Sequence, residues 1–239
     1  DEGIAIPILL GREAKIKQLI KENALDLDDV KIIDPKSIEQ AAIRDQFGGI
    51  LFEKRKRKGM TLTEAQKLMR ERNYFGLMMV EQDMADAFIS GISRNYPVTL
   101  RPALKIIGTD EGVDRVAGMF ILNTKKGTLF LADTTININP SSRELANIAM
   151  LTAKAVRRFN VVPRIALLSY SNFGSSLNSN VVRITEALKI IKETEPNLVV
   201  DGEIQADFAL NKEKREQIFP FSNLKQNANT LIFPNLELL

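Results

Sequence analysis

The sequence predicts an α/β protein whose mostly parallel, mixed sheets are covered by helices on both faces. Short apolar runs of strand length alternate with segments of helical periodicity along almost the entire chain, which is typical of parallel βα architecture. The apolar runs look buried on both sides, as strands of a covered parallel sheet are. A turn signal at 123–127, between two such runs, adds a hairpin, so we expect the sheet to be mixed.

The first half of the chain is predicted to contain three strands and three helices. The strands are expected at 6–10, 30–33 and 87–90, and the helices at 13–23, 61–73 and 100–107. The second of these helices is expected to open with a capping box, because Glu64 follows Thr61 at the required spacing. Pro102 is placed in the first turn of the third helix, where its missing N–H costs little.

A domain boundary is expected at 109–112, which assigns residues 1–110 to a first α/β domain and 111–239 to a second. Ser141 and Glu144 form another capping-box pattern, ahead of a helix that is expected to end near residue 159. The other elements predicted in this half are strands at 116–122, 128–132, 164–169, 198–200 and 230–233, and a helix at 181–192.

The composition restricts the chemistry that this segment can perform. Its 239 residues include neither cysteine nor histidine, which excludes disulfides, thiolate zinc sites, thiol nucleophiles and a Ser-His-Asp triad. The net charge of +3 argues against a general nucleic-acid-binding protein. We find neither a signal peptide pattern nor an apolar run of the roughly 18 residues that a membrane span needs, and we expect a cytoplasmic protein. Because no initiator methionine is present, we also expect a piece of a longer polypeptide.

Polar loops that follow predicted strands are the first candidates for a binding site, since ligands of parallel sheets bind outside the carboxyl ends of the strands. A Ser/Gly-rich loop, 170–176, leads from one strand into a helix and could offer hydroxyl and N–H groups to an anion. The alternative is a polar connection in which Asn178 or Ser179 caps the helix. Arg101 is expected in the first turn of its helix, where the macrodipole disfavours a cation, so either a bound anion or a partner carboxylate would compensate.

Charged residues gather at two further places. Residues 53–72 carry eight basic and three acidic side chains, and five consecutive cations run from Lys54 to Lys58. This run is either a solvated surface or a contact site for the phosphates of a nucleotide-like cofactor. Asp133, Asp201 and Glu203 stand at predicted strand ends and could suggest a metal, but turn and N-cap roles are favoured because no histidine accompanies them.

Four segments resemble the phosphate acetyltransferase family in order and spacing: ISGISRNYPVTLRPALKIIGT, PRIALLSYSNFGSS, DGEIQAD and NANTLIFPNL. The resemblance implies a two-domain, three-layer α/β/α fold, related to isocitrate and isopropylmalate dehydrogenases, with the active site in the cleft between the domains. It implies that Arg55 is a cleft arginine and that Arg101 binds phosphate. The binding site predicted for acetyl-CoA and phosphate comprises Arg55, Arg94, Arg101, Ser169, Ser171, Gly174 and Ser175, with no catalytic residue and no metal ligand.

Two departures from the family pattern direct the functional prediction. Arg94-Asn95-Tyr96-Pro97 stands where the family usually has a His-Ser-type sequence, and this version, like Asn172-Phe173, is similar to the C-terminal domain of multidomain NADP-dependent malic enzymes. The chain also starts after the family's first strand and helix and stops before its late Ser-Arg-Gly…Asp motif. The segment is therefore expected to be incomplete and non-catalytic.

The function predicted on this basis is regulatory. Acetyl-CoA would bind as an effector, and a malic enzyme domain in the same chain would decarboxylate malate with NADP and Mg²⁺ or Mn²⁺. At least a dimer, formed through the second domain, is implied by the resemblance. The alternatives are an active phosphate acetyltransferase, which moves acetyl between CoA and phosphate, and a plain oligomerisation module.

Overall fold

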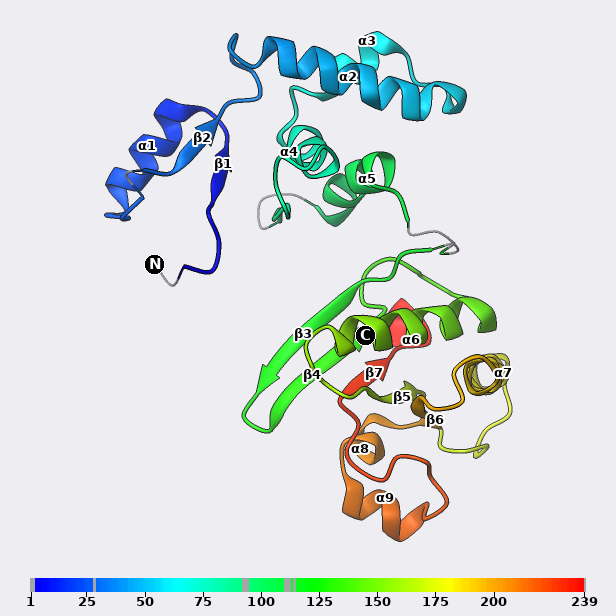
Figure 1. Cartoon of the computed structure of the whole chain (residues 1–239). Coiled ribbons are helices and arrows are strands. Elements are labelled where there is room, and N and C mark those ends of the chain that lie inside the picture. The colour runs from blue at the N-terminus through cyan, green and yellow to red at the C-terminus, as the bar shows by residue number, and fades with distance from the viewer. Residues whose placement is uncertain (1–2, 28, 92–94, 110–112, 114, 239) are drawn as a thin grey trace. The chain divides into compact units, whose positions relative to one another are not determined.

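Figure 1 shows a computed structural model of the chain, which describes residues 3–27, 29–91, 95–109, 113 and 115–238. The chain divides into two compact units, residues 1–110 and 111–239, each with a core of its own. Among the described residues, no helix is both long and apolar enough to cross a membrane.

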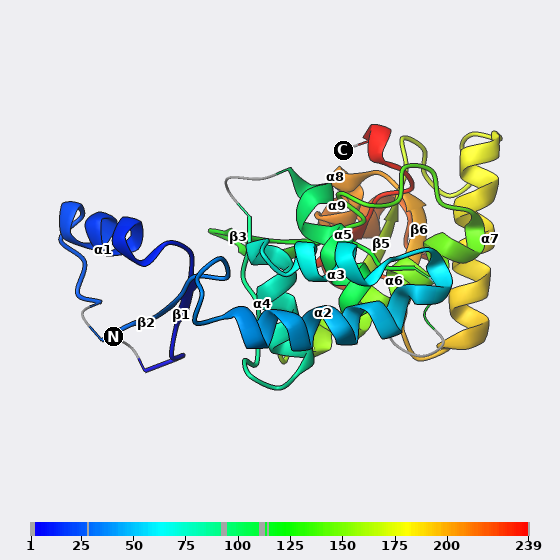
Figure 2. The same ribbon diagram turned by 90° about the horizontal axis from the view of Figure 1, so that it is seen from above.

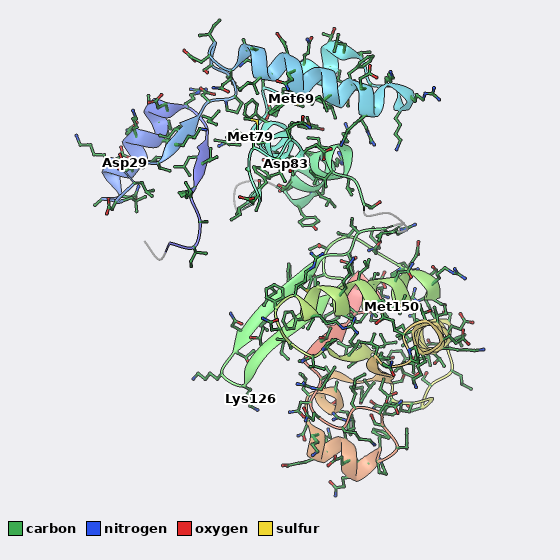
Figure 3. All side chains as sticks on the ribbon, viewed as in Figure 1. Asp29, Met69, Met79, Asp83, Lys126 and Met150 are labelled. Carbon is green, nitrogen blue, oxygen red and sulfur yellow. The ribbon has the colours of Figure 1, made fainter. Side chains whose placement is uncertain are left out.

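The first unit combines a small parallel sheet with a group of helices. Strands β1 (Ile8–Leu10) and β2 (Lys31–Ile33) pair in parallel and are connected by helix α1 (Glu13–Glu22). The remaining elements are α2 (Ala41–Arg55), the 3₁₀ turn η1 (Lys56–Lys58), α3 (Leu62–Leu68), α4 (Arg72–Glu81) and α5 (Tyr96–Ile106). Helices α2 and α3 lie side by side in both views of the ribbon (Figures 1 and 2). Buried apolar side chains from these helices, among them Met69 and Met79 (Figure 3), form the core.

Three predictions for this unit are wrong, and one helix was missed. The predicted strand at 87–90 makes no sheet pairing, although its Phe88 packs so closely against Gly76 that a Cβ there would clash with the ring. The predicted helix at 61–73 is two helices, which separate between Leu68 and Arg72. Helix α2 was not predicted. Pro102 lies inside α5 rather than in its first turn, because that helix begins at Tyr96.

The second unit is a three-layer α/β/α arrangement around one mixed sheet (Figure 1). The strand order is β3-β4-β7-β5-β6, with only the β3–β4 hairpin antiparallel. The strands are β3 (Met119–Thr124), β4 (Gly127–Ala132), β5 (Arg164–Leu168), β6 (Val199–Ile204) and β7 (Thr230–Ile232). The helices are α6 (Ser142–Arg157), α7 (Ser179–Thr194), α8 (Ala206–Ala209), α9 (Lys212–Ile218) and the 3₁₀ turn η2 (Leu236–Leu238). A mostly parallel, mixed sheet was predicted, and this is confirmed.

Alternate residues along the central strands face the two helical layers. In β5, Ile165 and Leu167 pack with α6 and α7, whereas Ala166 and Leu168 pack with α8 and the 224–228 segment. This alternation buries both faces of the strand, which explains why its sequence is apolar from Ile165 to Leu168. The capping box predicted at Ser141 is present, with Ser141 and Glu144 each accepting the other's backbone N–H.

Candidate functional site

The serine-rich loop, residues 169–178, leaves the carboxyl end of β5 and is attached to the end of β6. The backbone N–H of Ser169 donates to Ile204 O at 3.0 Å, and that of Phe173 donates to Glu203 O at 2.9 Å. Phe173 and Gly174 both have positive φ, +46° and +88°, which turns the chain back towards β6. Glycine adopts this conformation without a Cβ penalty, so the turn suits Gly174.

The buried carboxylate of Glu203, in β6, anchors the serine-rich loop through hydrogen bonds. It is only 2% exposed, and its Oε1 accepts the Gly174 N–H at 2.7 Å and the Ser171 hydroxyl at 3.2 Å. Since a hydroxyl has one proton, the 3.0 Å bond between Ser169 and Ser171 must be donated by Ser169. The hydrogen bonds therefore run from Ser169 through Ser171 to the carboxylate, and they hold the loop in one conformation.

The structure thus brings together four of the predicted site residues: Ser169, Ser171 and Gly174 meet above Glu203, and Ser175 belongs to the same turn. The Ser175 hydroxyl accepts the N–H of Asn172 at 3.0 Å. Asn172 is also bound to Gln205, whose backbone N–H donates to Asn172 Oδ1 at 2.8 Å. These hydroxyls organise the loop, and its Ser/Gly composition was the signal that located it.

The start of helix α7 follows the alternative interpretation. Asn178 is the N-cap, and its Oδ1 accepts the N–H groups of Asn180 and Val181 at 2.9 and 3.0 Å. The Tyr170 hydroxyl contacts both Ser176, at 2.8 Å, and the Asn178 amide. Because the protein itself satisfies the first N–H groups of α7, this helix end is not arranged as an anion site.

A cavity of about 570 Å³ lies between the loop, α7 and the 221–223 segment. Its walls are mostly apolar and include Phe173, Leu177, Val181 and Phe221. Glu203 is among its polar lining residues. This volume and this lining are typical of small-molecule sites, which combine apolar walls with a few fixed polar groups.

The arginines predicted for the site lie in the first unit. Arg55 ends α2 and is partly buried, whereas Arg101 is exposed on α5, and these two helices pack against each other. Neither guanidinium forms a hydrogen bond or ion pair with another residue that the structure describes. Arg101 lies in the second turn of α5, so the prediction of a first-turn cation opposed by the helix dipole is wrong. Arg94 lies outside the described residues.

Of the five consecutive cations, two form ion pairs with carboxylates of the described protein. Lys54 forms an ion pair with Glu81 of α4 and donates to Ile106 O of α5 at 2.9 Å, which joins three helices. Lys56 pairs with Glu53 one turn away. The other three cations of the run, Arg55, Arg57 and Lys58, have no such partner within the described parts of the chain and could contact an anion.

The three acidic strand ends serve the loops around them. Asp133 accepts the backbone N–H groups of 135–137 and Gly118. Asp201 accepts from Ser222 Oγ and the N–H of Asn223, at 2.8 and 2.7 Å. Turn roles were favoured over a metal site, and these bonds agree. The role of Glu203 as the anchor of the serine loop was missed, since its partners lie about 30 residues away and share no spacing pattern with it.

A family model described as phosphate acetyl/butaryl transferase matches residues 1–238. The chain belongs to this family. It is 37% identical to a phosphate acetyltransferase from Clostridium acetobutylicum over 99% of this chain and 72% of that protein. A phosphotransacetylase structure from Streptococcus pyogenes has 34% identity and a TM-score of 0.84, and it covers 99% of this chain and 71% of its own. The phosphotransacetylase-type fold predicted from the resemblance is therefore confirmed.

The prediction of a non-catalytic regulatory domain of a malic enzyme is wrong. An NADP-dependent malic enzyme from Haemophilus influenzae is also 37% identical, but the match covers only 31% of it, whereas the two transacetylases are matched over most of their lengths. The Arg94-Asn95-Tyr96-Pro97 pattern misled because a short sequence variation can be accommodated without changing the fold that carries it. The malic enzyme partner and the oxidoreductase assignment fall with it, and NADP and a divalent cation lose their basis.

Proposed function

We propose that this chain provides the acetyl-transfer machinery of a phosphate acetyltransferase, which moves an acetyl group between coenzyme A and phosphate. The observation that carries the proposal is the similarity to phosphate acetyltransferase over 99% of the chain. Acetyl-CoA is then a substrate, rather than the effector that was predicted.

The reaction needs residues that bind phosphate and stabilise negative charge. In the direction of acetyl-CoA synthesis, the CoA thiolate attacks the carbonyl carbon of acetyl phosphate, the C–S bond forms, and phosphate leaves as the C–O bond breaks. Negative charge on the phosphate and on the carbonyl oxygen must be stabilised throughout. Arg55 and Arg101 suit this role, because a guanidinium binds phosphate through two parallel N–H groups and neither arginine is paired within the described protein.

The serine-rich loop of the second unit is a preorganised surface in its own right. The bonds from Ser169 to Glu203 fix the serine loop before any ligand arrives, so little ordering would be required on binding. The apolar cavity beside this loop suits an uncharged chain such as the pantetheine arm of coenzyme A.

The test is an assay of acetyl-CoA formation from acetyl phosphate and CoA, with the protein expressed from its entire gene. Turnover in the ordinary enzymatic range, roughly 1–1,000 per second, is expected. Arg101→Ala should reduce kcat/KM about tenfold or more, since it removes a charge-assisted hydrogen bond, while exposed Lys58→Ala should change it less than threefold. A wild-type protein without turnover at millimolar substrates would contradict the proposal, and equal effects of the two variants would contradict the role of Arg101.

A further inference from the structure

A second cavity, of about 380 Å³, lies in the first unit where its two parallel strands end. Gly11 and Arg12 follow β1 at its rim, and residues 34–36 follow β2. Residues 70–72, which separate α3 from α4, complete the lining with Lys15 of α1. Parallel pairing places both carboxyl ends at one edge, and this edge is where sheets of this type bind ligands.

The charge around this cavity is strongly unbalanced. Two carboxylates, Asp34 and Glu71, face five cations, which leaves three positive charges in excess. Asp34 is already used locally, because it accepts the backbone N–H of Lys36 at 2.9 Å. The cations are Arg12, Lys15, Lys36, Arg70 and Arg72, and none of their side chains has a hydrogen bond or ion pair to another residue described by the structure. All five side chains are exposed, so water screens part of their mutual repulsion, and a bound anion would remove more of it.

Two helices also begin at this cavity. Arg12 is the N-cap of α1 and Glu71 the N-cap of α4, and neither side chain caps its helix. The N–H groups in the first turn of each helix are therefore not capped by these two side chains and can donate to a ligand. The positive ends of both helix dipoles also lie at the cavity. The carboxylate in the first turn of α1, Glu13, is paired with Lys17 at 2.6 Å.

We propose that this cavity is a binding site for the phosphate groups of a small phosphorylated molecule. The cations supply charge-assisted hydrogen bonds, and the two helix ends add backbone donors. The volume lies at the lower end of small-molecule sites, so there is room for more than one phosphate group. Neither Arg55 nor Arg101 lines it, which makes the site distinct from the residues assigned to acetyl transfer.

Inorganic pyrophosphate is the probe, titrated into the full-length protein by calorimetry at physiological salt. Arg12→Gln and Lys15→Gln should each weaken its binding roughly tenfold, because each removes a direct charged donor. Lys21→Gln is the matched control, since it removes the same charge from the same helix outside the cavity, and it should change the affinity less than twofold. Absence of pyrophosphate binding would overturn the site. Equal effects of Lys15→Gln and Lys21→Gln, or loss caused by Arg55→Gln instead, would overturn it too.

The same variants identify the source of the phosphate groups. If the site holds the phosphates of coenzyme A, Arg12→Gln and Lys15→Gln should also raise the KM for CoA about tenfold in the acetyl-transfer assay. If the ligand is a separate phosphorylated effector, the KM for CoA stays the same while the affinity for pyrophosphate falls. Both results support the site. Because the titration needs no turnover, it remains decisive even if acetyl transfer is not detected.

Discussion

Replacing Glu203 by alanine should release the serine-rich loop. The carboxylate is buried, and it is the acceptor for the Gly174 N–H at 2.7 Å and for the Ser171 hydroxyl at 3.2 Å. A hydrogen bond to a charged group contributes about 1.5–3 kcal/mol. The adjacent cavity would let water replace part of this loss, so we expect the free energy of loop opening to fall by about 2–4 kcal/mol in total.

This change is measurable by hydrogen exchange, because each 1.4 kcal/mol is a factor of ten in an equilibrium. The Gly174 amide should exchange roughly 30- to 1,000-fold faster in Glu203→Ala, whereas amides of the distant β3–β4 hairpin should not change. Glu203→Gln keeps an oxygen acceptor in place and should produce a smaller acceleration. If Gly174 exchanges at the wild-type rate in the alanine variant, the carboxylate does not hold the loop, and the reasoning fails.

Two further substitutions test the packing and electrostatics of single helices. Gly48→Ala should destabilise the protein by about 1–3 kcal/mol in urea denaturation, because the new Cβ would lie 2.9 Å from the Cα of Gln66. At Gly49, in the same helix, a Cβ meets nothing within 4 Å, so Gly49→Ala should stabilise the protein by up to about 1 kcal/mol. Destabilisation by both would refute this account of the α2–α3 contact. Hydrogen bonding from the Ser141 backbone, the largest cause, lowers the pKa of Glu144 from its ordinary 4.5, so its contribution is present above that pH and is lost as pH falls through the folded-state value. Glu144→Ala should therefore cost about 1 kcal/mol in melts at neutral pH and almost nothing in strong acid, and a cost independent of pH would contradict the sign.

Sequence patterns predicted the elements whose own residues contain the signal. Strand β5 is apolar from Ile165 to Leu168, and both the hairpin turn and the Ser141 capping box depend on neighbours in sequence. Helix α2 was hidden by Gly48 and Gly49, which have the composition of a turn. In the structure, Gly48 is where α3 approaches too closely for a side chain, and this contact cannot be seen from the local sequence.

The same limit applies to the candidate site. The strand predicted at 198–200 is β6, which begins at Val199 and continues through Asp201 and Glu203 to Ile204. The partners that make these buried carboxylates tolerable, Ser222 for Asp201 and Gly174 for Glu203, are 20 or more residues distant. The loop could be found from its composition, whereas the residue that anchors it required the folded chain.

The position of β7 restricts when the second unit can form during synthesis. This strand, residues 230–232, lies between β4 and β5, although it is made after the other four strands that the structure describes in this sheet. Until β7 leaves the ribosome, the sheet of the nascent chain consists of two separate parts, the β3–β4 hairpin and the β5–β6 pair. One edge of β4 and one edge of β5 are then unpaired. Such edges are prone to association with other chains. At about 5–20 residues per second, the roughly 60 residues between β5 and β7 take several seconds to make, and through that interval the nascent chain would depend on chaperones to cover those edges.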